Sequence, residues 1–130
     1  GCEVALERRD FVFIDDVVEA SYQAARAPEA AGRTFNVGSG IATTVIDVIE
    51  ALFAAFQTSV PVSVSGNYRF GDIRHNVANT TLLRDTLGFT PRVSFPDGVA
   101  RFVDWVLTQP SEDDRYQQSL DEMSARKLLK

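Results

Sequence analysis

Short apolar runs alternate with amphipathic helical stretches through the first half of the chain, and this order constrains the fold more than any other feature. Residues 10–14 form a compact apolar run that predicts a strand, and they lead into a helix that Pro28 ends. Residues 34–37 predict a second strand, and residues 38–40 a turn after it. This alternation is typical of α/β proteins, in which helices cover a sheet.

A helix with one apolar face is expected after that turn. Thr43 or Thr44 suits its N-cap, because a hydroxyl oxygen there can accept from a free backbone N–H group. Its apolar residues recur three and four positions apart, as in a helix that lies on a core. They are Val45, Val48, Ile49, Leu52, Phe53 and Phe56. Residues 60–65 alternate in polarity and include a proline, so we expect an edge strand there.

The rest of the sequence predicts helices rather than strands. A helix over about residues 80–87 should end at Gly88, because glycine readily adopts the left-handed conformation. Another helix should begin at Ser94 or Phe95. Residues 111–130 are expected to form a polar linker and an amphipathic tail helix. With so few strands, we expect an α/β unit of short strands plus a helical lobe, without a main Rossmann half.

Composition limits the classes of function. The chain has 130 residues and a net charge of −5, which disfavours binding to a nucleic-acid backbone. No apolar run approaches the ~20 residues that span a bilayer. One cysteine, Cys2, and one histidine, His75, supply too few ligands for a zinc site and no internal disulfide. A lone cysteine fits a reducing compartment, so we expect a cytoplasmic protein.

The strongest chemical signal is a short segment that contains Arg69, Asp72 and Arg74. A guanidinium can bind a phosphate through two parallel N–H donors, and a carboxylate can accept from a ribose or sugar hydroxyl. The segment therefore suits a ligand with both phosphate and hydroxyl groups. The alternative interpretation is a surface loop held by an Arg–Asp ion pair, which is worth ~0–1 kcal/mol when exposed.

Three segments, in order, resemble motifs of the extended short-chain dehydrogenases, in the NAD-dependent nucleotide-sugar epimerase/dehydratase family. Residues 9–18 resemble its Arg-Asp-aromatic segment, residues 35–40 its Phe-Asn-Val-Gly turn, and residues 69–72 its Arg-x-Gly-Asp element. The resemblance extends over about residues 9–129 and corresponds to the C-terminal part of the family's fold.

The resemblance implies a substrate-binding role, toward a nucleotide-diphosphate sugar, for Arg9, Phe11, Arg69, Asp72 and Arg74. In the family, the arginines at the positions of Arg9 and Arg69 meet phosphate, and the aspartate at the position of Asp72 meets a ribose hydroxyl. NAD is the cofactor of the parent enzyme, and the Gly-Asp-Ile-Arg-His pattern favours a 4-epimerase. Without the resemblance, Arg9 would be interpreted as a salt-bridge partner.

The 130 residues do not contain two of the family's chemical motifs. Gly38 and Gly40 begin a Gly-x-Gly pattern, but Thr43 occupies the place of the third glycine, so a tight structural turn is the favoured interpretation. None of the three tyrosines is followed four positions later by a lysine. We therefore expect residues 1–130 to be a C-terminal substrate-binding portion that is inactive by itself, with no catalytic, cofactor or metal residue.

Two other interpretations stay open. A non-catalytic module could cover its apolar surface, and the unpaired strand edges near Phe11 and Phe35, with a second copy of the chain. We expect a homo-oligomer on that ground. An unrelated small α/β domain would require three ordered matches to be accidental. His75 is interpreted as structural, because no nucleophile or second histidine lies near it in sequence.

Overall fold

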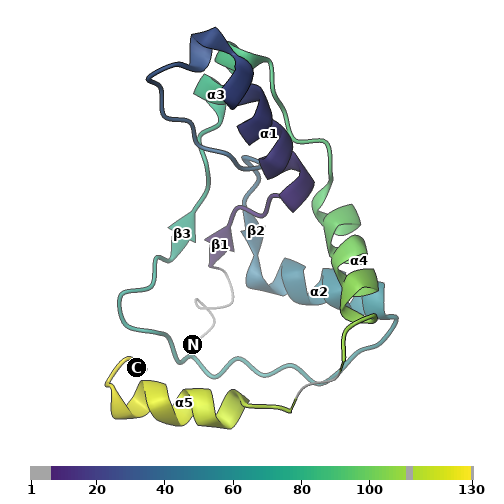
Figure 1. Ribbon diagram of the computed structural model, residues 1–130. Coiled ribbons are helices and arrows are strands. Elements are labelled where there is room, and N and C mark those ends of the chain that lie inside the picture. Colours follow the sequence, from purple (N-terminus) through teal and green to yellow (C-terminus); the bar gives the residue numbers. More distant parts are fainter. Residues whose placement is uncertain (1–6, 111–112, 130) are drawn as a thin grey trace.

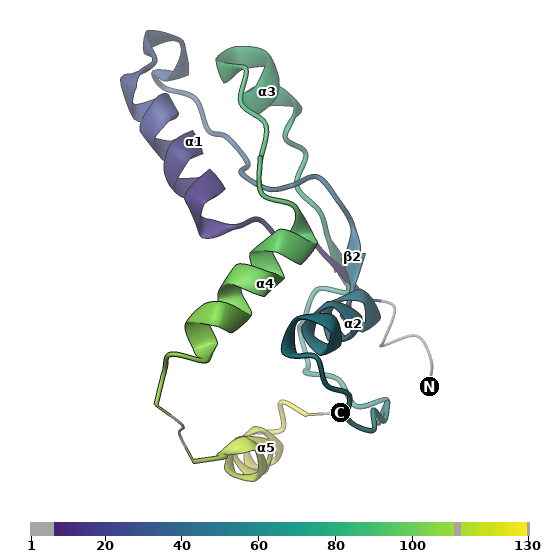
Figure 2. The same cartoon turned by 90° about the vertical axis from the view of Figure 1, so that its right-hand side faces the viewer.

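The computed structural model of the chain describes residues 7–110 and 113–129 (Figure 1). The elements are β1 (Arg8–Arg9), α1 (Ile14–Arg26), η2 (Pro28–Ala30), β2 (Thr43–Thr44), α2 (Val45–Phe56), β3 (His75–Asn76), α3 (Thr81–Leu87), α4 (Phe95–Val106) and α5 (Tyr116–Ala125). Helices α1 and α3 lie at one end, a small sheet and the α2–α4 pair in the middle, and α5 at the other end (Figures 1 and 2). The expected α/β class with a helical lobe is confirmed.

Strand β1 is the centre of a three-stranded sheet with the order β2-β1-β3. It pairs antiparallel with β2, where Arg9 lies opposite Thr43. It pairs parallel with β3, where Arg9 lies opposite Asn76. The backbone N–H of Arg8 also donates to the carbonyl of Arg74 at 3.2 Å. Arg9 therefore lies on the central strand, beside the segment that carries Asp72.

The best-buried core lies between α1 and α3. Ala20 and Leu83 are each 1% exposed, and Phe89 is 4% exposed beside them. Phe35, Val37 and Leu87 pack around this cluster. Helix α2 packs against α4, where Val103 is buried. Many large apolar side chains of the described residues stay exposed, among them Trp105 and Leu107 of this region.

The starts of α2 and α4 and the end of α3 follow the predicted local signals. Thr44 caps α2, since its hydroxyl accepts from the backbone N–H of Asp47 at 3.1 Å, and the Asp47 carboxylate accepts from the N–H of Thr44 at 2.8 Å. Gly88 follows α3 with φ 64°. Ser94 caps α4 through the N–H of Asp97. These interactions are local, so the sequence alone determines them.

The predicted strands are wrong in position. Residues 10–13, 34–37 and 60–65 are irregular, because no neighbouring segment in the described part of the chain forms ladder hydrogen bonds with them. The carbonyl of Phe13 instead accepts from the backbone N–H groups of Asp16 and Val17. That helix begins at Ile14, so Asp15 and Asp16, which are of a residue type suited to an N-cap, lie inside its first turn.

Asp16, in the first turn of α1, forms hydrogen bonds with a segment far along the chain. This carboxylate is 4% exposed and accepts from the backbone N–H groups of Arg92 at 2.9 Å and Val93 at 3.0 Å. It therefore ties α1 to the segment that precedes α4. Glu19, three positions further along α1, accepts from the side chain of Gln23.

The predicted tail helix is present as α5, and its linker is described except at residues 111 and 112. After α5, the carbonyl of Leu128 accepts from the N–H of Phe70 at 2.7 Å, and Leu129 forms a bridge with Arg69. The end of the tail thus holds the loop that carries Arg69. In the described residues, no helix combines the length and hydropathy that crossing a bilayer needs.

Candidate functional site

Arg9, Arg69 and Asp72 form one cluster at the surface. The carboxylate of Asp72 accepts from Nη2 of Arg69 at 3.0 Å on one oxygen and from Nη2 of Arg9 at 3.5 Å on the other. The side chains of Arg69 and Asp72 are 61% and 37% exposed, so a ligand can reach them. The structure therefore brings together three residues from positions that are 63 apart at the extremes.

Arg9 is the most firmly held member of this cluster. Its Nη1 donates to the carbonyl of Arg74 at 2.7 Å and to the carbonyl of Arg8 at 3.1 Å. Its Nη2 lies 3.4 Å from a carboxylate oxygen of Glu7. One edge of the guanidinium is thus fixed on backbone, while the other faces carboxylates that a phosphate could replace.

The neighbours of Asp72 favour the ionised form of its carboxyl group. The hydrogen bond from the Arg69 side chain is the largest effect that lowers the pKa of Asp72 below its usual 3.8, and the backbone N–H of Ile73 and the charge of Arg9 act in the same direction. The carboxylate is therefore a hydrogen-bond acceptor at neutral pH, as a role toward a hydroxyl group requires.

Phe11 and Arg74 lie differently from the other predicted residues. The ring of Phe11 packs on Phe95 with centroids 5.3 Å apart and lines an apolar hollow, away from the carboxylate cluster. Arg74 reaches the cluster through its carbonyl, which accepts from Arg9. His75 lies in β3 opposite Arg8, which fits the predicted structural role.

Asp10 has a position that sequence reasoning missed. Its carboxylate accepts from the backbone N–H groups of Ser39 at 2.7 Å, Gly40 at 2.9 Å and Ala78 at 3.0 Å, and from the hydroxyl of Ser39 at 2.5 Å. The sequence indicates a role for Asp10 only through its position next to Arg9, because its hydrogen-bond partners lie 29 to 68 positions away.

The same contacts decide how the glycine turn at residues 38–40 is interpreted. The N–H groups that would face a cofactor phosphate already bind the carboxylate of Asp10. The turn is therefore structural, as predicted, and the described residues do not offer a fit for NAD there. In residues 7–110 and 113–129, no group of three or more His, Cys, Asp or Glu is suited to hold a metal ion.

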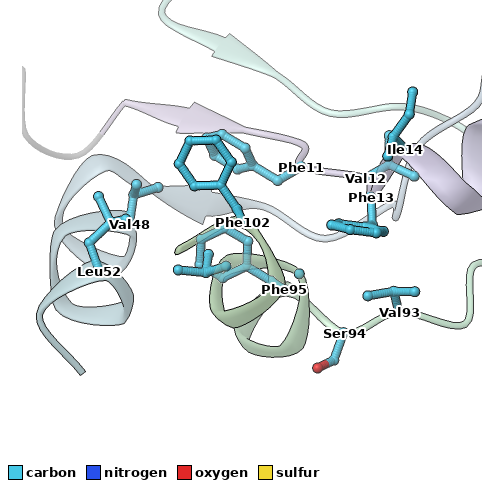
Figure 3. A pocket seen from close by; sticks show the side chains of 12 residues that line it. Phe11, Val12, Phe13, Ile14, Val48, Leu52, Val93, Ser94, Phe95 and Phe102 are labelled. Carbon is cyan, nitrogen blue, oxygen red and sulfur yellow. The ribbon is translucent and has the colours of Figure 1, made fainter. Parts of the chain in front are cut away.

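Two hollows differ in their chemistry. A hollow of about 410 Å³ lies beside Arg9, and its walls include Asp10, Asn36 and Asn76. Another, of about 440 Å³, lies between α2, α4 and residues 11–14. In Figure 3, Val48 and Leu52 of α2 face this apolar hollow together with the aromatic rings of α4. Among the residues that the structure describes, no titratable side chain lines this hollow, so it suits apolar packing and not a charged ligand.

The fold and the cluster define a small α/β unit that presents guanidinium and carboxylate groups at its surface. Comparison with known proteins agrees. Residues 4–38 match the model of the NAD dependent epimerase/dehydratase family. A dTDP-L-rhamnose 4-epimerase of Burkholderia thailandensis is 36% identical over 102 residues, which covers 78% of this chain and 28% of the relative. A UDP-glucose 4-epimerase of Mycolicibacterium smegmatis is 33% identical over 99 residues, which covers 76% of this chain and 31% of the relative.

Solved structures show the same similarity in space. A UDP-glucose 4-epimerase of Thermotoga maritima, solved with UDP-glucose, has a TM-score of 0.71 and 30% identity over 79% of this chain and 32% of its own. A UDP-glucose 4-epimerase of Bifidobacterium longum, in complex with NAD+ and UDP, shares the fold with a TM-score of 0.73 at 23% identity, over 81% of this chain and 31% of its own. Sequence and fold together show that the chain is related to the C-terminal part of the NAD-dependent epimerases/dehydratases. It spans about a third of the length of these relatives.

Proposed function

We propose that this chain provides the nucleotide-sugar-binding part of an NAD-dependent epimerase/dehydratase. We further propose that the reaction of the whole enzyme is 4-epimerisation. The observation that carries the proposal is the surface cluster of Arg9, Arg69 and Asp72, in which two guanidiniums share one carboxylate. Relatives named as 4-epimerases of UDP-glucose and dTDP-L-rhamnose support the substrate class.

The cluster can hold a nucleoside diphosphate by exchange of partners. A phosphate that enters between Arg9 and Arg69 accepts hydrogen bonds from the N–H groups that otherwise donate to Asp72. Such charge-assisted hydrogen bonds are stronger than hydrogen bonds between neutral groups. The carboxylate of Asp72 is then released to accept from a ribose hydroxyl. Arg9 keeps its orientation during this exchange, because the carbonyl of Arg74 still holds its other nitrogen.

The test is calorimetric titration of the chain with UDP and dTDP. Replacing Arg69 with alanine removes one phosphate donor and should weaken binding about tenfold or more, since a hydrogen bond to a charged group contributes about 1.5–3 kcal/mol. The better ligand of the two identifies the preferred nucleotide.

Arg84→Ala is the matched control. Arg84 is an exposed arginine on α3 that pairs with Asp85 at 3.1 Å, so its loss changes the net charge equally but lies outside the cluster. Binding by the control variant should equal that of the wild type. Equal affinity of Arg69→Ala and wild type, or the absence of binding to either nucleotide, would contradict the proposal.

We also propose that these residues bind substrate without carrying out the redox chemistry. The contacts of Asp10 with the glycine turn support this, because they occupy the amides that a cofactor phosphate would need. When bound to an enzyme of this class, NAD supplies hydride acceptance and return. Incubation of the chain with NAD and UDP-glucose should leave the sugar unchanged by chromatography, and turnover would overturn this part.

Finally, we propose that the chain associates with a second copy through its apolar face. This face comprises the α2–α4 hollow and its rim, where Phe102 and Trp105 are 50% and 57% exposed and their tilted rings lie with centroids 5.8 Å apart. Exposed apolar surface of this kind marks association sites. Light scattering should give the mass of a dimer or larger, which Phe102→Glu should reduce. A monomer at high concentration would count against it.

A further inference from the structure

The carboxylate of Asp10 joins three separate segments of the chain next to the ligand cluster. It accepts from the turn at Ser39 and Gly40 and from Ala78, just beyond β3, while its own residue follows Arg9 at the end of β1. A carboxylate with three backbone N–H donors and one hydroxyl donor uses all of its lone-pair positions. Asp10 is therefore a fixed junction, and its oxygens have no role left toward a ligand.

This junction has consequences for Arg9 because the sheet around it is very short. Each strand contains two residues, so backbone pairing alone places the segment from Asp72 to Asn76 weakly against β1. The bond from Ala78 fixes that segment just past its strand. The carbonyl of Arg74, which orients Arg9, lies on the same segment.

The packing around the carboxylate is close. A Cβ added at Gly38 would lie 2.5 Å from the Cβ of Ala78 and 2.6 Å from Oδ2 of Asp10. Burial alone raises the pKa of Asp10, but the hydrogen bonds from Ser39, Gly40 and Ala78 outweigh it, and the net pKa lies below the usual 3.8. At neutral pH the group is an anion, which accepts from all of these donors at once.

We propose that Asp10 is a positioning residue of the nucleotide site. By holding residues 75–78 against the end of β1, it sets the distance between the guanidinium of Arg9 and the loop of Arg69 and Asp72. The inference rests on the proposed function, and it adds a residue that acts only through Arg9 and never touches the ligand.

The variant Asp10→Asn tests it, because an amide has one acceptor oxygen and turns an NH2 group toward N–H donors. Asp16→Asn is the matched control. Asp16 is also a shielded carboxylate that accepts two backbone N–H groups, but it ties α1 to Arg92 and Val93, away from the cluster. Two readouts are taken on the full chain: UDP affinity by titration, and hydrogen–deuterium exchange of residues 69–78.

Asp10→Asn should weaken UDP binding about tenfold, the effect of one lost charged hydrogen bond, and should speed exchange in residues 69–78. Those residues include the N–H groups of Asp72 and Ile73, which are bonded to Arg69 and Asp72 within the loop. Asp16→Asn should lower the melting temperature and leave both readouts unchanged. If Asp10→Asn folds poorly, Ser39→Ala removes a single donor and should give a smaller shift in the same direction.

The outcomes separate the two proposals. Wild-type affinity and unchanged exchange in Asp10→Asn would overturn the positioning role, as would an equal loss of affinity in Asp16→Asn. Failure of the wild type to bind UDP would overturn the proposed nucleotide-binding role of the cluster. The exchange pattern of residues 69–78 would still decide whether Asp10 positions this loop.

Discussion

Replacing Gly38 with alanine should destabilise the chain through one identified contact. The new Cβ would lie 2.5 Å from the Cβ of Ala78, whereas carbon atoms in contact rest about 3.5–4.0 Å apart. The two segments must therefore separate by about 1 Å. That movement stretches the 3.0 Å bond from Ala78 to Asp10 beyond hydrogen-bond range.

The magnitude follows from this loss. A hydrogen bond to a charged group contributes about 1.5–3 kcal/mol, and the alanine restricts the unfolded chain by about 0.4–1 kcal/mol in the opposite sense. The free energy of unfolding should therefore fall by about 0.5–2.5 kcal/mol. Urea denaturation with an unchanged slope measures it.

A double-mutant cycle with Asp10→Asn tests the cause. If Gly38→Ala acts by breaking the Asp10 contact, the two losses should be less than additive by at least about 0.5 kcal/mol. Gly32→Ala is the control: its φ is 71° and its Cβ would meet nothing within 4 Å, so its loss should add to that of Asp10→Asn. Additivity of Gly38→Ala with Asp10→Asn would refute the reasoning.

Further predictions concern the core, a cap and pH. Leu83→Ala should lower the free energy of unfolding by about 2–5 kcal/mol because Leu83 is 1% exposed, while Leu82→Ala, at a residue 46% exposed, should cost far less; equal losses in urea denaturation would contradict the core assignment. Thr44→Ala should cost about 1 kcal/mol by the same assay through loss of the capping box, and an unchanged midpoint would argue against the cap. The native pKa of Asp10 is lowered, so its stabilisation is complete above the unfolded value of about 4 and is lost as the pH falls through the native value. The difference in melting temperature between wild type and Asp10→Asn should shrink as the pH is lowered from about 5 to 3, and a constant difference would exclude this linkage.

The helices were predictable because their signals are local. The Thr44 cap, the apolar stripe of α2 and the left-handed Gly88 each act within a few positions. The strands were not predictable in the same way, since a strand exists only where a neighbour offers hydrogen bonds. Residues 10–14 have strand-like composition, yet only Arg8–Arg9 find partners, on β2 and β3.

The same difference between local and long-range contacts applies to the site residues. The Arg69–Asp72 ion pair, which was the alternative interpretation of this segment, is present at 3.0 Å, and the role of both residues toward a ligand stays a prediction. The proximity of Arg9 came from the family resemblance and agrees with the fold. Phe11 shares a motif with Arg9, but it lies in the irregular segment that follows β1, and its ring packs on Phe95. The hydrogen bonds of Asp10 could not be predicted from the sequence, because their donors lie on segments far along the chain.

The contacts at the short central strand β1 also imply an order in which parts of the chain fold. The bonds from Arg9 to Arg74 and from Ala78 to Asp10 close loops of 65 and 68 positions, whereas the capping box of α2 closes three. Chain closure over a long stretch costs more entropy, and local contacts form faster. The helices can thus form on their own timescale, while the anion-binding cluster exists only after distant segments have met. Occupancy of that cluster by a nucleotide would report that the long-range assembly of this region is complete.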